Sequence, residues 1–485
     1  MLERSLAVRL RPAAGRVLRR AGRWRELAGH WQLLTLLLIG ALVRALFMVA
    51  FSPALFFPDS WGYITSAFAH GFLGLSLRWP VGYALLIRLL TLPGRSIIEL
   101  IAAQHLVGLG CGVAIYAVLL RGGLSRWAAA AAASLVLLDG YAITLEQYVM
   151  SDTFASATML GALLALAWGR VGARTPLSGR AAAVSGLLFA AAVLQREAAL
   201  FIFPVMLAYL VWVRARWTRL AVFLACAAIP LLGYASLVDQ KYDVFGLGAA
   251  SGWTLYGRVA SFADCRDFTV SAAARPLCET AAQRAAHPSA PDWYIWGPSP
   301  AVRLFKPASE SVAQSAATNA LLDSFARQAI LSQPLRMASV TIADFLRYLT
   351  PGVMPYANPV SATSLPVRLR RETIRRGLIR RYLPGMRPRI NPPAALLRAY
   401  RSRIHLPRPV LALLALASVG ALALRAPARR EVLLFSGAAL LLLLGTAATG
   451  GFSLRYLLPA VAPLAIGGAL AGAQLRGAWR ARGDR

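Results

Sequence analysis

The stretch WQLLTLLLIGALVRALFMVAF, residues 31–51, decides the fold class of this chain. Its single charged residue is Arg44, and a helix of about 20 apolar residues is long enough to cross the hydrocarbon core of a membrane. Similar runs recur along the chain, in which 58% of the 485 residues are hydrophobic. The sequence therefore predicts an all-α polytopic membrane protein.

The apolar runs predict a bundle of about ten transmembrane helices, with an uncertainty of about two. The predicted spans are 31–51, 96–120, 127–144, 151–168, 181–195, 198–213, 219–237, 407–424, 431–449 and 456–475. A helix in the long loop before residue 407 is predicted to be amphipathic and to lie along a membrane or protein surface, because apolar residues recur there at helical spacing: Leu321, Leu322, Phe325, Ala329 and Ile330. The segment 337–353 is too short and too polar to predict a further span.

The distribution of arginine predicts the orientation. Residues 1–30 are basic, which by the positive-inside rule predicts a cytoplasmic N-terminal segment ahead of a retained anchor. The predicted organisation then continues with a transmembrane module with functional outer loops at 31–238, a large outer loop at 239–405, C-terminal transmembrane helices at 406–476 and a cytoplasmic tail at 477–485. Residues 368–403 are rich in arginine yet fall outside, either holding anionic lipid headgroups or reflecting composition alone.

Charge and cysteine content exclude some functions and suggest one covalent link. The net charge of +32 would suit a nucleic-acid partner only if a soluble domain presented it, and we expect no nucleic-acid binding. The five histidines are too scattered to predict a zinc site. Cys265 and Cys278 lie in the large loop, and they are predicted to form a disulfide if that loop is outside the cytoplasm. Cys111 and Cys226 fit buried packing positions.

Acidic residues gather at the predicted outer ends of the spans, where ionisable groups are costly and suggest function. They are Asp59, Asp139, Glu146, Asp152 and Glu197. Structural explanations stay open at this point. Asp59 and Asp152 could cap helices, Asp139 could serve a turn beside Gly140, and Glu197 could pair with Arg196.

These residues carry a resemblance to a known family. The sequence has PDSWGY around Asp59, a Pro-Val-Gly-Tyr segment at 80–83, MSDTF around Asp152, QRE at 195–197 and RYLLPAVAPL from Arg455. In this order they resemble the membrane-embedded glycosyltransferases of the GT-C superfamily, and they are similar to its protein O-mannosyltransferase and aminoarabinose-transferase branch. The resemblance follows the order of spans over most of the chain, and each motif in it is short.

The resemblance implies a GT-C-like bundle and an enzyme that uses a polyprenyl-phosphate sugar as donor and a glycan, lipid or protein as acceptor. It implies that Asp59 is the catalytic base, that Asp152 is a second acid with Glu146 as competitor, and that Arg455 and Tyr456 serve the donor. The chain departs from better-known members in its short Asp59–Ser60 pair and in having no recognisable folded C-terminal domain. Acceptor identity and the use of a divalent metal ion stay open, and no metal ligand is predicted.

Physical chemistry suggests which further residues would take part. Planar guanidinium groups suit the leaving phosphate, which favours Arg196 and Arg455, followed by Arg78. Possible substrate contacts are Tyr63, Tyr83, Glu146, Glu197, Trp293 and Trp296. Together with an alanine- and arginine-rich composition typical of bacteria, the resemblance implies an inverting, mannosyltransferase-like enzyme of a bacterial cell membrane that works on the cell envelope at the outer face. The alternatives are a transporter or flippase of a lipid-linked saccharide, and a membrane scaffold.

Overall fold

The computed structural model describes residues 29–69, 71, 73–92, 96–173, 175–305, 316–351, 364–369 and 374–483. Within these ranges the named elements are all helices, and the β-type pairing is one isolated bridge between Leu55 and Tyr148. The prediction of an all-α polytopic membrane protein is confirmed. Most of the segment 1–30 lies outside the described residues.

The helices fall into a bundle and a lobe at one of its ends. The bundle is built from α2 (Trp31–Ala50), α4 (Val81–Leu90), α5 (Ile98–Arg121), α6 (Arg126–Leu137), α7 (Gly140–Gln147), α8 (Asp152–Ala167), α9 (Gly179–Gln195), η1 (Glu197–Ile202), α10 (Phe203–Trp212), α11 (Trp217–Tyr242), α21 (Arg408–Ala423), α22 (Arg429–Val432), η3 (Leu433–Gly437), α23 (Ala438–Thr449) and α24 (Leu454–Gly483). The remaining helices are α3 (Pro58–Ala69), α12 (Ser251–Val259), η2 (Arg275–Leu277), α13 (Ala281–Ala285), α14 (Pro291–Trp296), α15 (Pro300–Phe305), α17 (Ala316–Ser332), α18 (Pro334–Arg347), α19 (Arg376–Tyr382) and α20 (Ala394–Arg403).

Five described helices are long and apolar enough to cross a membrane, or up to seven spans if each of two bent helix pairs counts as one. The bent pairs are α6 with α7 and α20 with α21. The predicted number of about ten is higher because it included α8, α9 and the η1–α10 segment. With 16 residues in α8 and 17 in α9, these helices lie at the lower end of the roughly 17–25 residues typical of a transmembrane helix.

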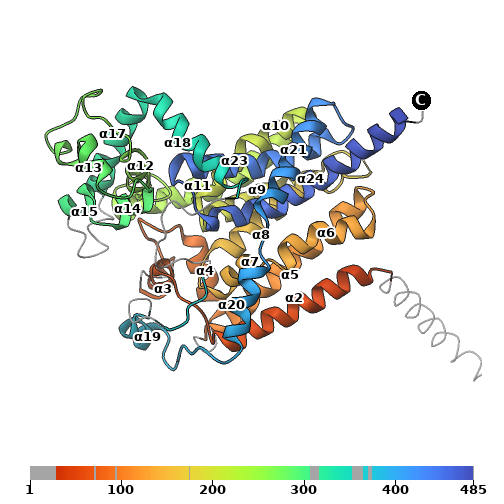
Figure 1. Ribbon diagram of the computed structural model, residues 1–485, viewed down its shortest axis with the longest axis horizontal. Coiled ribbons are helices and arrows are strands. Elements are labelled where there is room, and N and C mark those ends of the chain that lie inside the picture. Colours follow the sequence, from red (N-terminus) through yellow and green to blue (C-terminus); the bar gives the residue numbers. More distant parts are fainter. Residues whose placement is uncertain are drawn as a thin grey trace, which may run out of the picture.

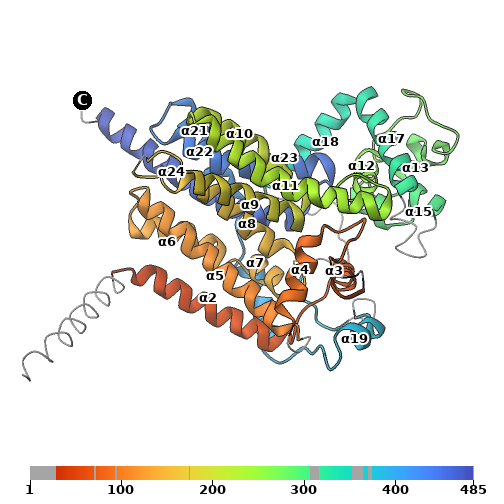
Figure 2. The same ribbon diagram turned by 180° about the vertical axis from the view of Figure 1, so that it is seen from behind.

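The long helices run side by side, and both ends of the described chain lie at the same end of the bundle (Figure 1). The opposite end carries α3, α19 and the green helices α12 to α15, which Figure 2 shows from behind. Leucines such as Leu38 and Leu413 are 72% and 66% exposed on the bundle surface. Lipid chains would cover such side chains in a membrane, because hydrocarbon is as apolar as leucine.

We call the described residues 251–305 and 316–347, from α12 (Ser251–Val259) to α18 (Pro334–Arg347), the end lobe. Its core includes Tyr256, Tyr294 and Phe325, and a disulfide joins Cys265 to Cys278 at its edge. The predicted amphipathic helix is α17, whose Leu322, Phe325 and Ala329 are buried against this core. The surface on which this helix lies is therefore protein.

Candidate functional site

Four charged side chains meet at the end of the bundle that carries α3. Asp59 lies in the first turn of α3, Asp152 opens α8, Arg196 directly follows α9, and Arg455 is the second residue of α24. Arg455 joins the two acids: its Nη1 donates to Asp59 Oδ2 at 2.7 Å, and its Nε donates to both carboxylate oxygens of Asp152 at 3.0 Å. Arg196 Nη1 donates to Asp152 Oδ1 at 2.5 Å. We call these four residues the acid–arginine cluster.

The two acids of the cluster differ in accessibility. The side chain of Asp152 is 1% exposed and holds both arginines, whereas the side chain of Asp59 is 14% exposed. No described residue donates a hydrogen bond to Asp59 Oδ1. The carboxylate of Asp152 thus binds guanidinium groups instead of capping its helix, and Asp59 keeps one oxygen for another partner.

A third acid, Asp292, lies within the electrostatic reach of the cluster, and the sequence analysis missed it. It stands in the first turn of α14 in the end lobe. Burial raises the pKa of Asp292, the charge of Asp59 raises it further, and Arg455 opposes this rise. A weak signal was present in the sequence: Pro291–Asp292 repeats the Pro-Asp pair of Pro58–Asp59, and a tryptophan follows each pair, Trp293 directly and Trp61 after one intervening serine.

Aromatic side chains surround the cluster. The hydroxyl of Tyr63 shares a 3.0 Å hydrogen bond with Ser151 Oγ, next to Asp152, and burial raises the pKa of Tyr63. The ring of Tyr63 packs against Trp79 and, edge to face, against Tyr83, with centroid distances of 4.9 and 5.0 Å. These contacts hold the ring of Tyr63 in place beside Asp152.

Tyr456 and Arg78 both take part in cation–π contacts, Tyr456 through its ring and Arg78 through its guanidinium group. The guanidinium of Arg196 lies 5.0 Å from the ring centroid of Tyr456. The guanidinium of Arg78 lies 4.7 Å from Trp79 and 4.6 Å from Trp296, so both rings hold it. Tyr456 thus contacts the cluster directly through Arg196, whereas Arg78 contacts Trp79, which packs against Tyr63 beside the cluster.

The two tryptophans predicted as a sugar platform differ in their surroundings. The ring of Trp293 stacks on His287 with a centroid distance of 3.7 Å, so one of its faces is already covered. Trp296 is 56% exposed. Of this pair, Trp296 is the more exposed side chain.

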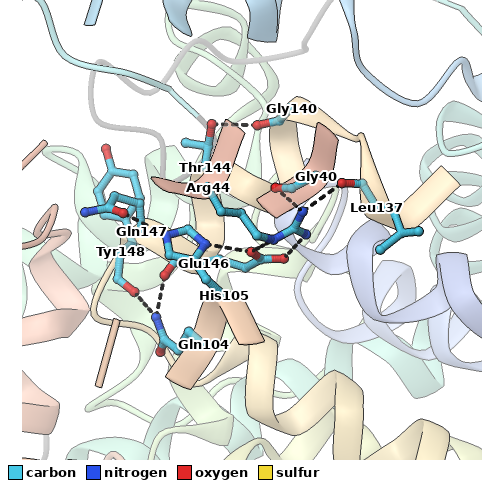
Figure 3. A network of polar contacts seen from close by, with 10 residues as sticks. All are labelled: Gly40, Arg44, Gln104, His105, Leu137, Gly140, Thr144, Glu146, Gln147 and Tyr148. Atoms are coloured by element: carbon cyan, nitrogen blue, oxygen red, sulfur yellow. Dashed lines mark hydrogen bonds and ion pairs between the residues drawn. The ribbon is translucent and has the colours of Figure 1, made fainter. Parts of the chain in front are cut away.

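Glu146 belongs to a separate network, buried between α2, α5 and α7 (Figure 3). Arg44 donates two 2.8 Å hydrogen bonds to the Glu146 carboxylate, from Nε and Nη2, and His105 Nδ1 lies 2.8 Å from Glu146 Oε2. The three residues are only 2% to 3% exposed. Glu146 was the predicted competitor of Asp152 and a possible substrate contact, but the structure brings Asp152, not Glu146, to Arg455.

This buried network holds the backbone that leads to both acids of the cluster. Gln104 Nε2 donates to the carbonyl oxygens of Glu146 and Tyr148, and Gln147 Nε2 donates to the carbonyl of Phe51. Residues 147–149 also pair with Leu55, in the segment before α3, because Leu55 N donates to Gln147 O and Val149 N donates to Leu55 O. The two chain segments that end at Asp59 and Asp152 are therefore tied together before they reach Arg455.

Gly108 on α5 gives a test of this network. A Cβ at this position would lie 2.0 Å from Glu146 Oε1, whereas a Cβ at Gly110 would meet nothing within 4 Å. We expect Gly108→Ala to lower the melting temperature of the purified protein, because the Arg44–Glu146 pair must shift to make room. The matched control on the same helix is Gly110→Ala, and equal melting temperatures for the two variants would contradict the role of the network.

Two further predicted acids lie outside the cluster. Asp139 caps α7 by accepting a 2.9 Å hydrogen bond from Tyr141 N, in line with its alternative as a turn residue. Arg196 pairs with Asp152 and not with the adjacent Glu197. The Glu197 carboxylate instead faces Gly248, where an added Cβ would lie 3.1 Å from Glu197 Oε1.

The described residues contain no group of three or more His, Cys, Asp or Glu side chains placed to hold a metal ion. In the cluster itself, the guanidinium of Arg455 stands between the carboxylates of Asp59 and Asp152. The arrangement can therefore offer one partly free carboxylate oxygen and several N–H donors to a substrate.

Comparisons with known proteins gave two similar structures. No protein-family model matches the sequence, and no curated protein matches it. The archaeal oligosaccharyltransferase AglB from Archaeoglobus fulgidus, solved in complex with an inhibitory peptide and a dolichol-phosphate, is 15% identical with a TM-score of 0.43 over 94% of this chain. The oligosaccharyltransferase of Archaeoglobus fulgidus in the apo form is 13% identical with a TM-score of 0.41 over 93%. This chain spans about half the length of both, 52% in each case.

Proposed function

We propose that this protein is a membrane-embedded glycosyltransferase that moves a sugar from a polyprenyl-phosphate donor to an acceptor hydroxyl. The observation that carries the proposal is the acid–arginine cluster at one end of an apolar helix bundle. A lipid-borne donor presents its phosphate and sugar at the membrane boundary, where such a cluster can meet them. The motif resemblance to the GT-C superfamily points to the same activity.

Asp59 is assigned as the general base. Its Oδ1 is free of hydrogen bonds from described residues, and its side chain is more exposed than that of Asp152. The acceptor oxygen attacks the anomeric carbon while its proton moves to Asp59. The bond from that carbon to the phosphate oxygen breaks, polyprenyl phosphate leaves, and the configuration inverts in this single displacement. A positioned base contributes about 10²- to 10⁴-fold to such a step.

The arginines are assigned to the leaving phosphate, with Asp152 as the residue that positions them. Arg455 Nη2 and Arg196 Nη2 donate no hydrogen bond to a described residue, so both can bind phosphate oxygens. Because Asp152 accepts hydrogen bonds from both Arg455 and Arg196, their guanidinium groups are held in place before the donor binds. Fixed donors aimed at developing charge lower the barrier without reorganisation.

The orientation in the membrane and the further contacts follow from the same proposal. We place the cluster end at the outer face, with both termini in the cytoplasm, as the arginine pattern predicts. Trp296, Arg78 and Tyr63 would border the sugar or acceptor, and Asp292 would face the cluster from the end lobe. The acceptor class and any divalent metal ion are left open by these contacts.

Transport of a lipid-linked saccharide would require polar groups that line a path through the bundle. Arg44, His105 and Glu146 lie between α2, α5 and α7, where Glu146 binds both of the other side chains and all three are almost fully buried. A closed network of this kind fits structural support. We therefore favour the transferase.

Arg455→Lys tests the assignment of this side chain to the donor phosphate. Lysine keeps the charge but cannot bridge Asp59, Asp152 and a phosphate with one planar fork. We expect the KM for the polyprenyl-phosphate sugar to rise by roughly 10- to 100-fold, since hydrogen bonds to charged groups contribute about 1.5–3 kcal/mol. The measurement is a donor titration of purified protein in detergent. Arg266→Lys, with a side chain 88% exposed in the end lobe, is the control; an unchanged KM for Arg455→Lys would remove Arg455 from donor binding.

A further inference from the structure

A cavity of about 480 Å³ opens at the end of the bundle opposite the acid–arginine cluster. Its lining includes Gln474, which lies about 19 residues after Arg455 on α24 and therefore roughly 28 Å farther along that helix. Figure 1 shows this end of α24 beside the links that follow α5, α8 and α21. The cavity is thus independent of the proposed catalytic site.

The charge of the cavity is strongly positive. Four arginines and one glutamate line it: Arg170, Arg425, Arg429, Arg430 and Glu431. The distance from Glu431 Oε1 to Arg170 Nε is 3.7 Å. Arg170 Nε is buried without a hydrogen-bond partner among the described residues. One acid cannot neutralise four guanidinium groups, so the lining has an excess of positive charge and of N–H donors.

The cavity walls are fixed and partly apolar. Gln474 Oε1 accepts a 3.1 Å hydrogen bond from Ala428 N, which holds the link between α21 and α22 against α24. Arg429 rests on the ring of Trp212 at 5.4 Å. Leu124 and Leu470 also line the cavity, so an occupant meets cations and hydrocarbon together.

We propose that this cavity binds a phosphate-bearing anion, of the chemistry shared by an anionic phospholipid headgroup and free phosphate. Arginine forks match phosphate oxygens with two parallel hydrogen bonds each, and the volume suits a headgroup-sized ligand. The apolar walls favour the lipid as the source. The proposed orientation places the cavity at the cytoplasmic leaflet, where anionic lipids concentrate.

The test measures binding to the full-length protein in detergent by native mass spectrometry. The probes are short-chain phosphatidylglycerol, short-chain phosphatidylcholine as the neutral lipid, and inorganic phosphate. The site variant is Arg425→Gln with Arg429→Gln and Arg430→Gln. The control removes the same charge from exposed positions, as Arg180→Gln with Arg216→Gln and Arg476→Gln.

We expect phosphatidylglycerol to bind the site variant at least about tenfold more weakly than the control, because each lost charged hydrogen bond contributes roughly that factor. If inorganic phosphate displaces phosphatidylglycerol, the site also accepts a soluble phosphate. If it does not, the occupant is the anionic phospholipid. If the site variant does not fold, Ala473→Phe, which fills the cavity and keeps the arginines, must weaken binding instead. Equal binding by site and control variants, or by Ala473→Phe and wild type, would overturn the proposal.

Discussion

Asp59→Asn is expected to reduce sugar transfer by about 10²- to 10⁴-fold, the contribution of a positioned general base. Asparagine keeps the size of the side chain and can still accept the hydrogen bond from Arg455 Nη1, but it cannot take the acceptor proton. The KM for the donor should change far less than kcat. The measurement compares transfer of label from a polyprenyl-phosphate sugar by purified wild type and variant.

Asp323→Asn is the matched control for this substitution. Asp323 lies on α17 in the end lobe, and its ion pair with Arg327 is exposed. Removing such a pair changes stability by about 0–1 kcal/mol, so transfer should be unaffected. If Asp59→Asn transferred sugar at the rate of Asp323→Asn, Asp59 would not be the base.

Arg44→Met is expected to cause the largest loss of stability, roughly 3–5 kcal/mol, because it leaves the Glu146 carboxylate buried without its bidentate partner. Arg44 also donates 2.7 and 3.2 Å hydrogen bonds to the carbonyls of Leu137 and Gly40, which lose their donor as well. The measurement is the melting temperature of the purified protein in detergent, with exposed Arg126→Met as the control.

The double variant Arg44→Met with Glu146→Leu separates loss of the pair from loss of packing. Apolar residues of similar size often replace a buried ion pair with little loss of stability. We therefore expect the double variant to melt above Arg44→Met alone. A melting temperature for Arg44→Met equal to that of Arg126→Met would show that the pair does not support the bundle.

The sequence predicted the helical class and several members of the cluster because local patterns carry that information. The ten spans predicted from the sequence placed Asp152, Arg196 and Arg455 on one side, and the structure brings them together at the start of α8, the end of α9 and the start of α24. Asp59 follows the first span in the same way. The catalytic roles of these residues are proposals that the experiments above test.

Other parts of the site depend on contacts distant in sequence. Asp292 stands about 230 residues after Asp59, on the short helix α14, whose position depends on the packing of the end lobe. The pairing of Arg44 with Glu146 spans 102 positions, and no local pattern identifies it. Hydropathy also does not decide whether a short apolar helix such as α8, with 16 residues, crosses the membrane as a span of its own.

The most direct test of the proposed function follows the fate of a doubly labelled donor in proteoliposomes that contain the purified protein. The sugar carries one label and the polyprenyl phosphate another, and an extract of membrane glycans, lipids and proteins supplies the acceptor. A transferase separates the two labels and releases free polyprenyl phosphate, and Asp59→Asn should suppress this release. Labels that stay together while the intact donor crosses to the other leaflet would contradict the account and indicate a flippase.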